Sequence, residues 1–149
     1  MITVKAFLDQ KGRQVHTMSA EDTVMEAARV MTEQGIGCVV VMKGDEIVGI
    51  FTERDMVRDV VLKKRSPEDT PLADVMTSPV STCQVEDTLR DCALMMQEKQ
   101  IRRLPVADDG RLLGIVTARD VFLSQLQNKD ATIEDLVQHI FTAGVSPRG

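Results

Sequence analysis

The 149-residue sequence contains no tryptophan or tyrosine and only four phenylalanines. Proteins that bind single-stranded nucleic acid usually stack the bases on aromatic side chains, and those platforms are missing here. Basic residues are also in the minority, since the formal net charge is −5 and the pI is about 5.0. A surface that binds the phosphate backbone needs the opposite balance. Both features argue against nucleic acid as a partner.

Long hydrophobic runs are absent as well. The longest apolar stretch covers residues 36–42, whereas a membrane-spanning helix needs about 20 residues. The opening residues 1–8 are too few, and too soon followed by Asp9, to form the apolar part of a signal peptide. No small-residue cleavage site follows them. We therefore expect a cytoplasmic protein without a membrane segment.

Residues that could carry catalysis are few. Cys38, Cys83 and Cys92 include no close pair, so neither a disulfide framework nor a CxxC metal site is indicated, and we interpret them as small core residues. His16 and His139 are isolated, and no Gly-rich phosphate loop is present. Because no nucleophile, base and orienting group stand at a useful spacing, the sequence predicts no catalytic residue, no metal site and no catalytic cofactor. We do not expect an enzyme.

What the sequence does contain is an internal repeat. The heptapeptide GIFTERD at residues 49–55 returns as GIVTARD at 114–120, which is 65 positions later. The same shift aligns residues 15–55 with residues 80–120 without a gap, and 15 of the 41 aligned positions are identical. The chain is therefore two copies of one unit.

Each copy shows the same order of expected elements. Apolar residues at i, i+4 and i+7 predict a helix with one core face, and two apolar runs around a turn with Asp and Gly are typical of a β-hairpin. A short strand near Val15 or Val80 precedes the helix, and a further helix follows the heptapeptide, so the unit is β-α-β-β-α. These elements rest on Val24, Ala28, Met31, 38–42, 47–51, Met56, Val60 and Val61 in the first copy, and on Leu89, Ala93, Met96, 104–107, 112–116, Val121, Phe122 and Leu126 in the second.

The boundaries of the copies follow from composition. Residues 63–71 are polar and contain proline, as is typical of a surface linker. We predict a first repeat at 10–65 and a second at 72–127. About fifty residues bury too little surface for a good core, so the repeats should pack on each other in one α/β fold with short helices at both ends. A C-terminal helix is expected at 130–142 because Thr132 and Asp135 form a capping pair, and 143–149 should be disordered.

The heptapeptide permits two interpretations. Thr52 and Asp55, like Thr117 and Asp120, have the spacing of a capping box, in which a hydroxyl and an acid satisfy free backbone N–H groups at a helix start. The same helix start could hold a phosphate, because its N–H groups and dipole favour an anion and the arginine within the heptapeptide adds a cation. The acid could accept hydrogen bonds from ribose hydroxyls. The residues alone leave both interpretations open.

The complete pattern resembles a known family. A β-α-β-β-α unit that ends on Gly-x-x-Thr-x-x-Asp is similar to the cystathionine β-synthase (CBS) domain, and two units in tandem resemble the CBS pair called a Bateman module. The resemblance covers about residues 10–127, extends to small stand-alone CBS-pair proteins and implies a pseudo-two-fold pair of repeats. Its most specific segments are IVGIFTERDMV (47–57), DVMTSPV (74–80), EDTLRDCALMM (86–96) and IRRLPVADDGRLLGIVTARDV (101–121).

The resemblance also implies where a ligand would sit. In the family, adenosine-containing ligands occupy clefts between the two repeats, with the motif Asp on the ribose and the motif Thr near the phosphates. Basic residues of the second strand often face the phosphates, and the segment that enters the other repeat closes each cleft. For the first cleft this gives Thr52, Arg54, Asp55, Met76, Thr77, Pro79 and Val80. For the second it gives Lys11, Gly12, Val15, Arg102, Arg103, Ile115, Thr117, Arg119 and Asp120.

The two copies differ at one position that matters for phosphate. Residues 36–38 read Ile-Gly-Cys where residues 101–103 read Ile-Arg-Arg. We therefore predict that the second cleft is the stronger phosphate site and that the first is weak, empty or selective for less charged ligands. The two arginines could equally be solvated residues at a strand edge. Equal losses of binding in Asp55→Ala and Asp120→Ala would count against the prediction.

The function that the resemblance implies is a non-catalytic sensor of an adenine nucleotide. AMP, ADP or ATP is expected first, with NAD(H) and S-adenosylmethionine behind them. The family also implies a disc-like homodimer formed through helices, and a regulated partner that this chain does not identify. The alternative is an interaction or scaffold module whose heptapeptides serve only as helix caps. A ligand would raise the thermal stability in the first case and leave it unchanged in the second.

Overall fold

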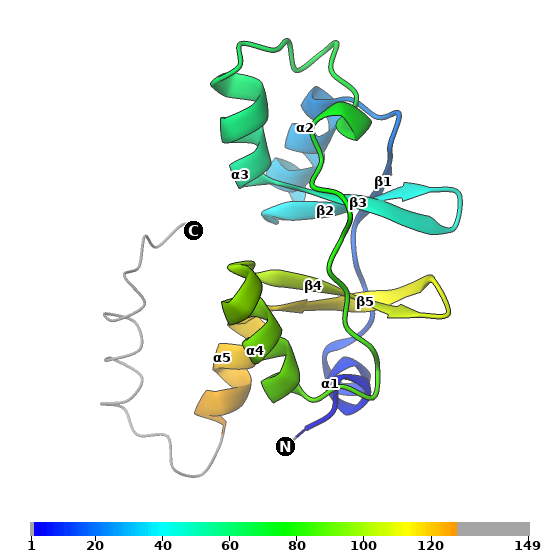
Figure 1. Ribbon diagram of the computed structural model, residues 1–149, viewed down its shortest axis with the longest axis vertical. Coiled ribbons are helices and arrows are strands. Elements are labelled where there is room, and N and C mark those ends of the chain that lie inside the picture. The colour runs from blue at the N-terminus through cyan, green and yellow to red at the C-terminus, as the bar shows by residue number, and fades with distance from the viewer. Residues whose placement is uncertain (1, 128–149) are drawn as a thin grey trace.

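The computed structural model describes residues 2–127 and contains the two predicted β-α-β-β-α units, one above the other in Figure 1. A helix, α1 (Val4–Lys11), precedes them. The first unit consists of β1 (Thr17–Ser19), α2 (Val24–Gln34), β2 (Cys38–Lys43), β3 (Glu46–Thr52), the short helix α3 (Glu53–Asp55) and the π-helical segment η1 (Met56–Val61). The second follows a 3-10 turn, η2 (Leu72–Asp74), with α4 (Leu89–Lys99), β4 (Arg103–Asp108), β5 (Arg111–Thr117) and α5 (Ala118–Leu126).

The long helices start and pack as their sequences predict. Thr23 and Thr88 cap α2 and α4 with complete capping boxes, each of which stabilises its helix by about 0.5–2 kcal/mol relative to alanine. The buried residues are Val24, Ala27 and Met31 in α2, and Leu89, Cys92 and Met96 in α4. The core stripe is therefore confirmed, and it is centred one residue earlier than Ala28 and Ala93, which are half-buried.

Both predicted hairpins are present. β2 and β3 are antiparallel with Val40 opposite Ile50, and β4 and β5 are antiparallel with Pro105 opposite Ile115. Gly44 has a φ of 61° in the first turn, and Gly110 has a φ of 79° in the second. Glycine adopts this left-handed backbone without the steric cost that a Cβ brings. The equal registers show that the repeat in sequence is also a repeat in pairing.

The first strand is formed in one copy only. β1 pairs in parallel with β2, and the Val40 N–H donates to the His16 carbonyl over 3.0 Å. In the second copy, the strand predicted near Val80 is reduced to an isolated parallel bridge between Cys83 and Val106. Pro105 stands where the first copy has Val40. Since proline has no N–H to donate, the parallel ladder is one hydrogen bond shorter there.

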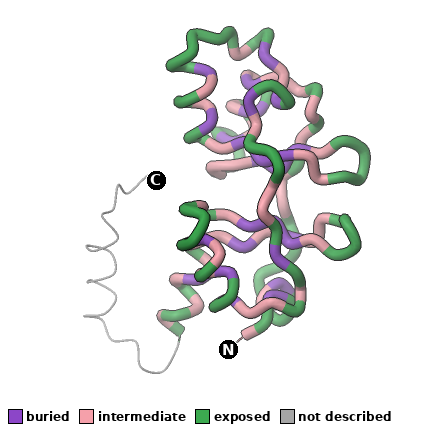
Figure 2. The backbone as a smooth tube through the Cα atoms, viewed as in Figure 1, coloured by how far each residue is buried: buried purple, intermediate pink, exposed green. Residues whose placement is uncertain are grey.

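Each repeat completes its core with a segment from outside it. Val4 and Leu8 of α1 belong to the buried cluster of the second repeat, whereas Leu72 of η2 and Val75 belong to that of the first. Figure 1 shows α1 beside the lower hairpin, and Figure 2 shows buried positions along the strands of both halves. The borrowed segments supply the apolar area that a unit of about fifty residues lacks.

The first glycine of each heptapeptide makes room for these borrowed segments. A Cβ at Gly114 would collide with the Leu8 side chain, and one at Gly49 would collide with the Met76 side chain. A larger residue at either position would force these side chains to shift. The glycine that both copies share is therefore explained by packing.

The helix after the first heptapeptide differs from its prediction. It begins as α3 but continues as the π-helix η1, in which Val60 is buried and Val61 is 61% exposed. The wider π-helical turn shifts the residues that follow it, so the expected pairing of Val60 and Val61 on one core face is wrong. The expected helix at 130–142 and the tail at 143–149 lie outside the described residues. In residues 2–127, no helix combines the length and apolar composition that a membrane span requires.

Candidate functional site

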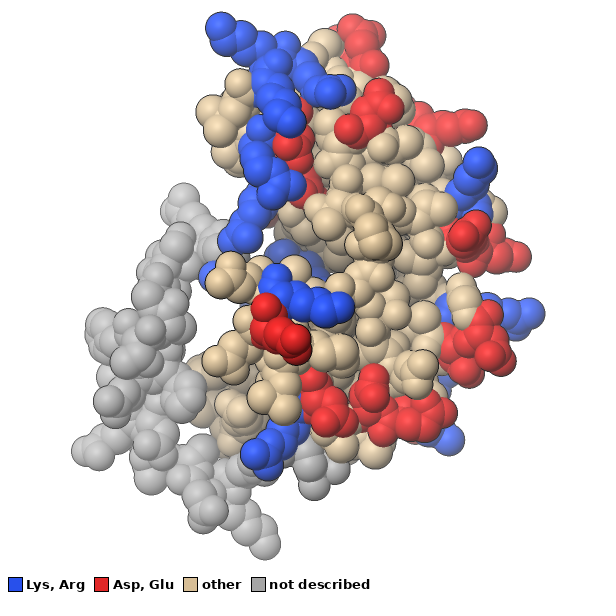
Figure 3. Space-filling model, in the orientation of Figure 1, with Lys and Arg blue, Asp and Glu red and all other residues tan. Residues whose placement is uncertain are grey.

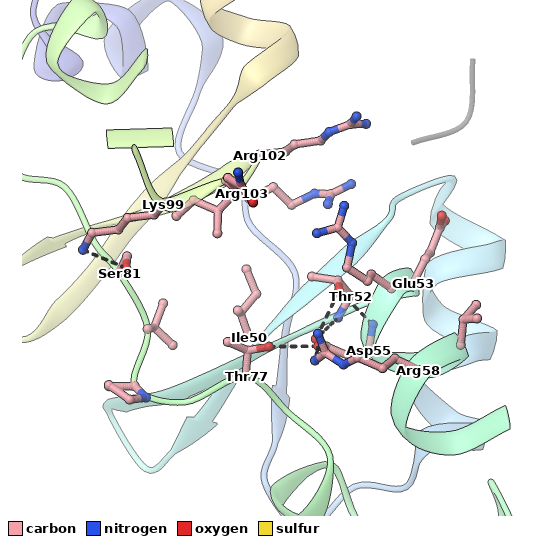
Figure 4. Close-up of a pocket in the computed structure, with 16 residues that line it drawn as sticks. Ile50, Thr52, Glu53, Asp55, Arg58, Thr77, Ser81, Lys99, Arg102 and Arg103 are labelled. Atoms are coloured by element: carbon pink, nitrogen blue, oxygen red, sulfur yellow. Dashed lines mark hydrogen bonds and ion pairs between the residues drawn. The ribbon is translucent and has the colours of Figure 1, made fainter. Parts of the chain in front are cut away.

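A cavity of about 580 Å³ lies between the two repeats, next to the first heptapeptide. Figure 4 shows it from the side, with the end of β3 on one wall and the residues between α4 and β4 on the other. The volume is in the range of small-molecule sites. The lining residues are Ile50, Thr52, Glu53, Arg54, Asp55, Val57, Arg58, Thr77, Pro79, Val80, Ser81, Lys99, Gln100, Ile101, Arg102 and Arg103.

Asp55 is the buried acid of this cavity, with a side chain that is 3% exposed. Its Oδ2 accepts a hydrogen bond from the Thr52 N–H at 2.9 Å, and the Thr52 hydroxyl accepts one from the Asp55 N–H at 3.2 Å. The capping box predicted for the heptapeptide is therefore confirmed. The other oxygen, Oδ1, accepts hydrogen bonds from the Thr77 hydroxyl at 2.9 Å and from Arg58 at 2.9 Å. One carboxylate oxygen thus caps the helix while the other faces groups that line the cavity.

Two apolar surfaces flank this acid. Ile50 exchanges two backbone hydrogen bonds with Thr77, at 3.0 Å and 2.8 Å, which holds the segment from Thr77 to Val80 against β3. Pro79 and Val80 continue that wall, and Ile101 belongs to the lining contributed by the second repeat. Apolar walls with a few fixed polar groups are typical of sites that hold a flat organic ligand.

Arg102 and Arg103 also line this cavity. The guanidinium of Arg103 reaches Gly37 of the first repeat, where a Cβ would collide with it, and Glu53 lies next to the same point. Figure 4 shows both arginine side chains on the wall of the second repeat, across from Thr52 and Asp55. The prediction that these arginines serve the second cleft is therefore wrong, and so is the expectation that the first cleft lacks paired cations.

The physical reason for this error is the way in which the repeats face each other. β3 and β5 lie against each other. As a result, the start of β4 lies next to Thr52 in the heptapeptide of the first repeat, and not next to the heptapeptide of its own repeat. From the sequence alone, Arg102 and Arg103 are assigned to the cleft of their own repeat. Only the packing of one hairpin on the other shows that they line the cleft of the other repeat.

Basic side chains outnumber acids around the cavity. Arg54, Arg58, Lys99, Arg102 and Arg103 line it, against the acids at positions 53 and 55. Figure 3 shows Lys and Arg atoms beside the groove between the repeats and along the edge above it. A protein with a net charge of −5 has thus concentrated positive charge at one site, which attracts and orients an anion.

Arg58 at the rim of the cavity and its neighbour Asp59 have shifted pKa values. A hydrogen bond to Asp59 raises the pKa of Arg58, and the same bond lowers the pKa of Asp59 below its usual value. At the start of β2, outside the lining of the cavity, burial raises the pKa of the Cys38 thiol, although the positive charge of Arg103 acts in the opposite direction. Cys38 is therefore protonated near neutral pH and is a poor nucleophile.

The second heptapeptide has a different environment. The Asp120 Oδ2 accepts hydrogen bonds from the Thr117 N–H at 2.8 Å and from Lys11 Nζ at 2.6 Å. Lys11 also donates to the Ile115 carbonyl. Arg119 is exposed on α5. The structure brings Lys11, Ile115, Thr117 and Asp120 together as predicted, whereas Val15 lines another cavity, with Arg111 and Leu112.

Several lining residues of the first cavity were not predicted. Arg58 stands three residues after Asp55, a spacing that allows an ion pair on a helix. Lys99 lies at the end of α4 and donates to the Ser81 hydroxyl at 3.1 Å. No motif marks Lys99 in the sequence, because it reaches the cavity only through the packing of the repeats.

Comparison with known proteins agrees with this geometry. The model of the CBS domain family matches residues 12–62 and 72–126, which is most of the chain and includes both heptapeptides. The chain belongs to the CBS domain family. It is a tandem CBS pair with a mixed α/β fold, as its repeat predicts.

Relatives of this CBS pair include proteins of similar and of greater length. The chain is 32% identical over 123 residues to the CBS domain-containing protein YhcV of Bacillus subtilis, and the match covers 83% of this chain and 87% of that protein. It is 42% identical over 111 residues to an uncharacterized protein of Methanopyrus kandleri. That match covers 73% of this chain but only 57% of the relative.

Two solved structures are similar to the CBS pair. A protein with CBS domains from Burkholderia ambifaria has a TM-score of 0.81 and 36% identity, and the match covers 88% of this chain and 98% of that one. The CBS domain pair of protein MJ0100 has a TM-score of 0.72 and 26% identity, with 85% and 95% covered. The MJ0100 structure is a complex with 5′-methylthioadenosine and S-adenosyl-L-methionine.

Proposed function

We propose that this CBS pair is a non-catalytic regulatory module that binds an adenine nucleotide, AMP, ADP or ATP, in the cavity next to the first heptapeptide. The observation that carries the proposal is the combination of a buried carboxylate, Asp55, with Arg102 and Arg103 from the opposite repeat in one cavity. The adenosyl ligands of the MJ0100 pair support the adenosine part of the ligand. The arginines, which suit phosphate, support the nucleotide part.

Each part of such a ligand has a chemically matched group. Asp55 Oδ1 faces the cavity and can accept hydrogen bonds from ribose hydroxyls once Arg58 turns aside. Arg58 can do so because it already has a second carboxylate partner, Asp59, at 3.0 Å. The Thr52 hydroxyl, Arg54 and the two arginines of the second repeat would meet the phosphates, and the wall from Thr77 to Val80 would cover the base.

Binding in this cavity would connect the two repeats. The acid belongs to the first repeat and the paired arginines to the second, so a nucleotide would bridge the units and neutralise the repulsion among the cations. A ligand changes a conformational equilibrium only through its different affinity for the two states. We infer that ligand binding favours a more closed arrangement of the repeats, and that a partner protein responds to this change.

We also propose that the CBS pair forms a homodimer through its helices. Figure 1 places α3, α4 and α5 on one side of the hairpins. Val57, Val61, Leu62, Leu94 and Leu123 lie on or next to these helices and are 43–72% exposed. Such apolar side chains are typical of surfaces that a partner covers. Light scattering should give a dimer mass for the native chain and a monomer mass for Val61→Glu, and a native monomer would contradict the proposal.

The test of ligand binding is calorimetric titration of protein shown to be free of bound nucleotide. ATP, ADP, AMP, adenosine, 5′-methylthioadenosine, S-adenosylmethionine, NAD and NADH would be compared. We expect Asp55→Asn to weaken the binding of every ligand that binds, by about tenfold to a hundredfold, because hydrogen bonds to a charged group contribute about 1.5–3 kcal/mol each. Arg102→Met/Arg103→Met should weaken nucleotides much more than adenosine. Arg111→Met, an exposed arginine outside the cavity, is the matched control.

The outcomes separate the two classes of function. If none of the eight ligands binds, the heptapeptides are helix caps and the interaction module is the better description. If adenosine and 5′-methylthioadenosine bind as tightly as ATP, the arginines do not contact phosphate and the nucleotide part of the proposal fails. Binding that survives Asp55→Asn would place the ligand elsewhere.

A further inference from the structure

Asp120 of the second heptapeptide is held by a lysine from a distant part of the chain. Lys11 Nζ lies 2.6 Å from Asp120 Oδ2 and 3.2 Å from the carbonyl oxygen of Ile115. The same ammonium lies 5.6 Å from the centroid of the Phe7 ring. Three groups thus fix the lysine on the acid that corresponds to the proposed ribose acceptor of the first cleft, Asp55.

The helix that carries Lys11 is anchored in the core. Val4 and Leu8 of α1 are at most 1% exposed within the second repeat. Gly12, with a φ of 101°, ends the helix directly after Lys11, and its N–H donates to the Leu8 carbonyl over 2.7 Å. The position of the lysine backbone is therefore fixed before any ligand arrives.

The carboxylates of Asp55 and Asp120 accept hydrogen bonds from different side chains. Asp55 accepts from Thr77 and Arg58, but Gly12 and Leu123 stand at the corresponding positions of the second repeat. Asp120 has therefore lost both of these donors. Lys11 supplies a cation to Asp120, but at Oδ2, the oxygen that also accepts from the Thr117 N–H, whereas both donors to Asp55 bind Oδ1.

Arg58 can move away from Asp55 more easily than Lys11 can move away from Asp120. The Arg58 side chain is 57% exposed and keeps a second ion pair with Asp59 when it leaves Asp55. The Lys11 side chain is 31% exposed, and its ion pair within residues 2–127 is with Asp120. Moving Lys11 would separate a partly buried pair without a substitute, which costs more than turning a solvated arginine.

We infer that Lys11 neutralises and holds the carboxylate of the second heptapeptide and thereby limits the CBS pair to one nucleotide, bound in the first cleft. Ribose hydroxyls are neutral donors, and a charged donor bound to a carboxylate is the stronger competitor. Lys11 is thus the residue that sets the stoichiometry. The inference rests on the proposed function, because it takes a ribose-bearing nucleotide as the ligand.

The test is the number of bound ATP molecules per chain, measured by calorimetry and by equilibrium dialysis. We expect one for the native chain, for Lys5→Met and for Lys11→Arg, and two for Lys11→Met. Lys5 is an exposed lysine of the same helix, so it controls for loss of charge on α1. The additional site should vanish in Lys11→Met/Asp120→Asn, while Lys11→Met/Asp55→Asn should keep it and lose the first site. Circular dichroism checks that each variant is folded.

The outcomes for the inference and for the proposed function can be told apart. Two sites in the native chain would overturn the inference and leave the proposed function intact. A Lys11→Met variant that binds one ligand, or binds more weakly, would also overturn it, since the lysine would then assist binding or have no part in it. No binding by the native chain, with one Asp120-dependent site in Lys11→Met, would overturn the first-cleft function and the stoichiometry of one, and would support only the blocking of Asp120 by Lys11. No binding by either protein would overturn both.

Discussion

The guanidinium of Arg103 in the second repeat lies against Gly37 of the first, in the space that a Cβ at position 37 would fill. This contact explains a difference between the copies, because Arg102 stands at the position of Gly37 in the second repeat. The absence of a side chain at Gly37 in the first repeat thus leaves room for the Arg103 side chain of the second repeat. The contact connects the repeats at the rim of the proposed nucleotide cavity.

A methyl group at this contact should affect binding more than stability. In Gly37→Ala the flexible end of Arg103 must move, whereas the backbone can stay, so we expect the free energy of unfolding to change by less than about 1 kcal/mol. Nucleotide affinity should fall about tenfold if one charge-assisted hydrogen bond is lost. Calorimetry on Gly37→Ala, Arg103→Met and the double variant forms a mutant cycle. A Gly37→Ala penalty of the same size in the Arg103→Met background would show that the arginine is not the cause.

The glycine of the second heptapeptide should be sensitive for a structural reason. Gly114→Ala places a methyl group against Leu8 of α1, which is 1% exposed, and overpacking of this kind costs about 1–3 kcal/mol. Urea denaturation of the variant measures this loss. The matched background is Leu8→Ala, which removes the colliding atoms. If Gly114→Ala costs as much in that background as in the native chain, contact with α1 is not the reason for this glycine.

Pro105 should be the residue that prevents a first strand in the second repeat. In Pro105→Val the new N–H can donate to the carbonyl of Ser81, as that of Val40 does to His16. The gain of about 0.5–1.5 kcal/mol from the hydrogen bond is offset by about 0.4–1 kcal/mol from the greater freedom of the unfolded chain. We therefore expect little change in stability but slow hydrogen exchange of the new amide. An amide that exchanges as fast as an exposed one would mean that no strand has formed.

Acid should weaken the cap of α4. Hydrogen bonds from the Thr88 N–H and hydroxyl lower the pKa of Asp91 below its usual 3.8. A lowered pKa in the folded state adds stability that is present above pH 3.8 and is lost as the pH falls through the folded value. Asp91→Asn should therefore lower the Tm at pH 7, and the difference from the native chain should shrink towards pH 3. A difference that stays constant over this range would contradict the assignment.

Local pattern predicted much of this fold. The repeat, the capping threonines, the two hairpins and the stripes of α2 and α4 are properties of residues close in the chain, and each is present in the structure. The errors also have local causes. Pro105 removes a donor that the alignment with Val40 implied, and the π-helical turn of η1 exposes Val61, which a regular period would have placed near the core.

The sequence by itself determined the family and the chemistry of the heptapeptides, because a capping box needs only residues three apart and the repeat is read directly. Tertiary structure decided which groups share a site. Arg102 and Arg103 line the first cavity, and Lys11 meets Asp120 across 109 positions of the chain. The reason is that the hairpins pack on each other and each core takes a segment from outside its repeat, so partners are set by packing geometry and not by order along the chain.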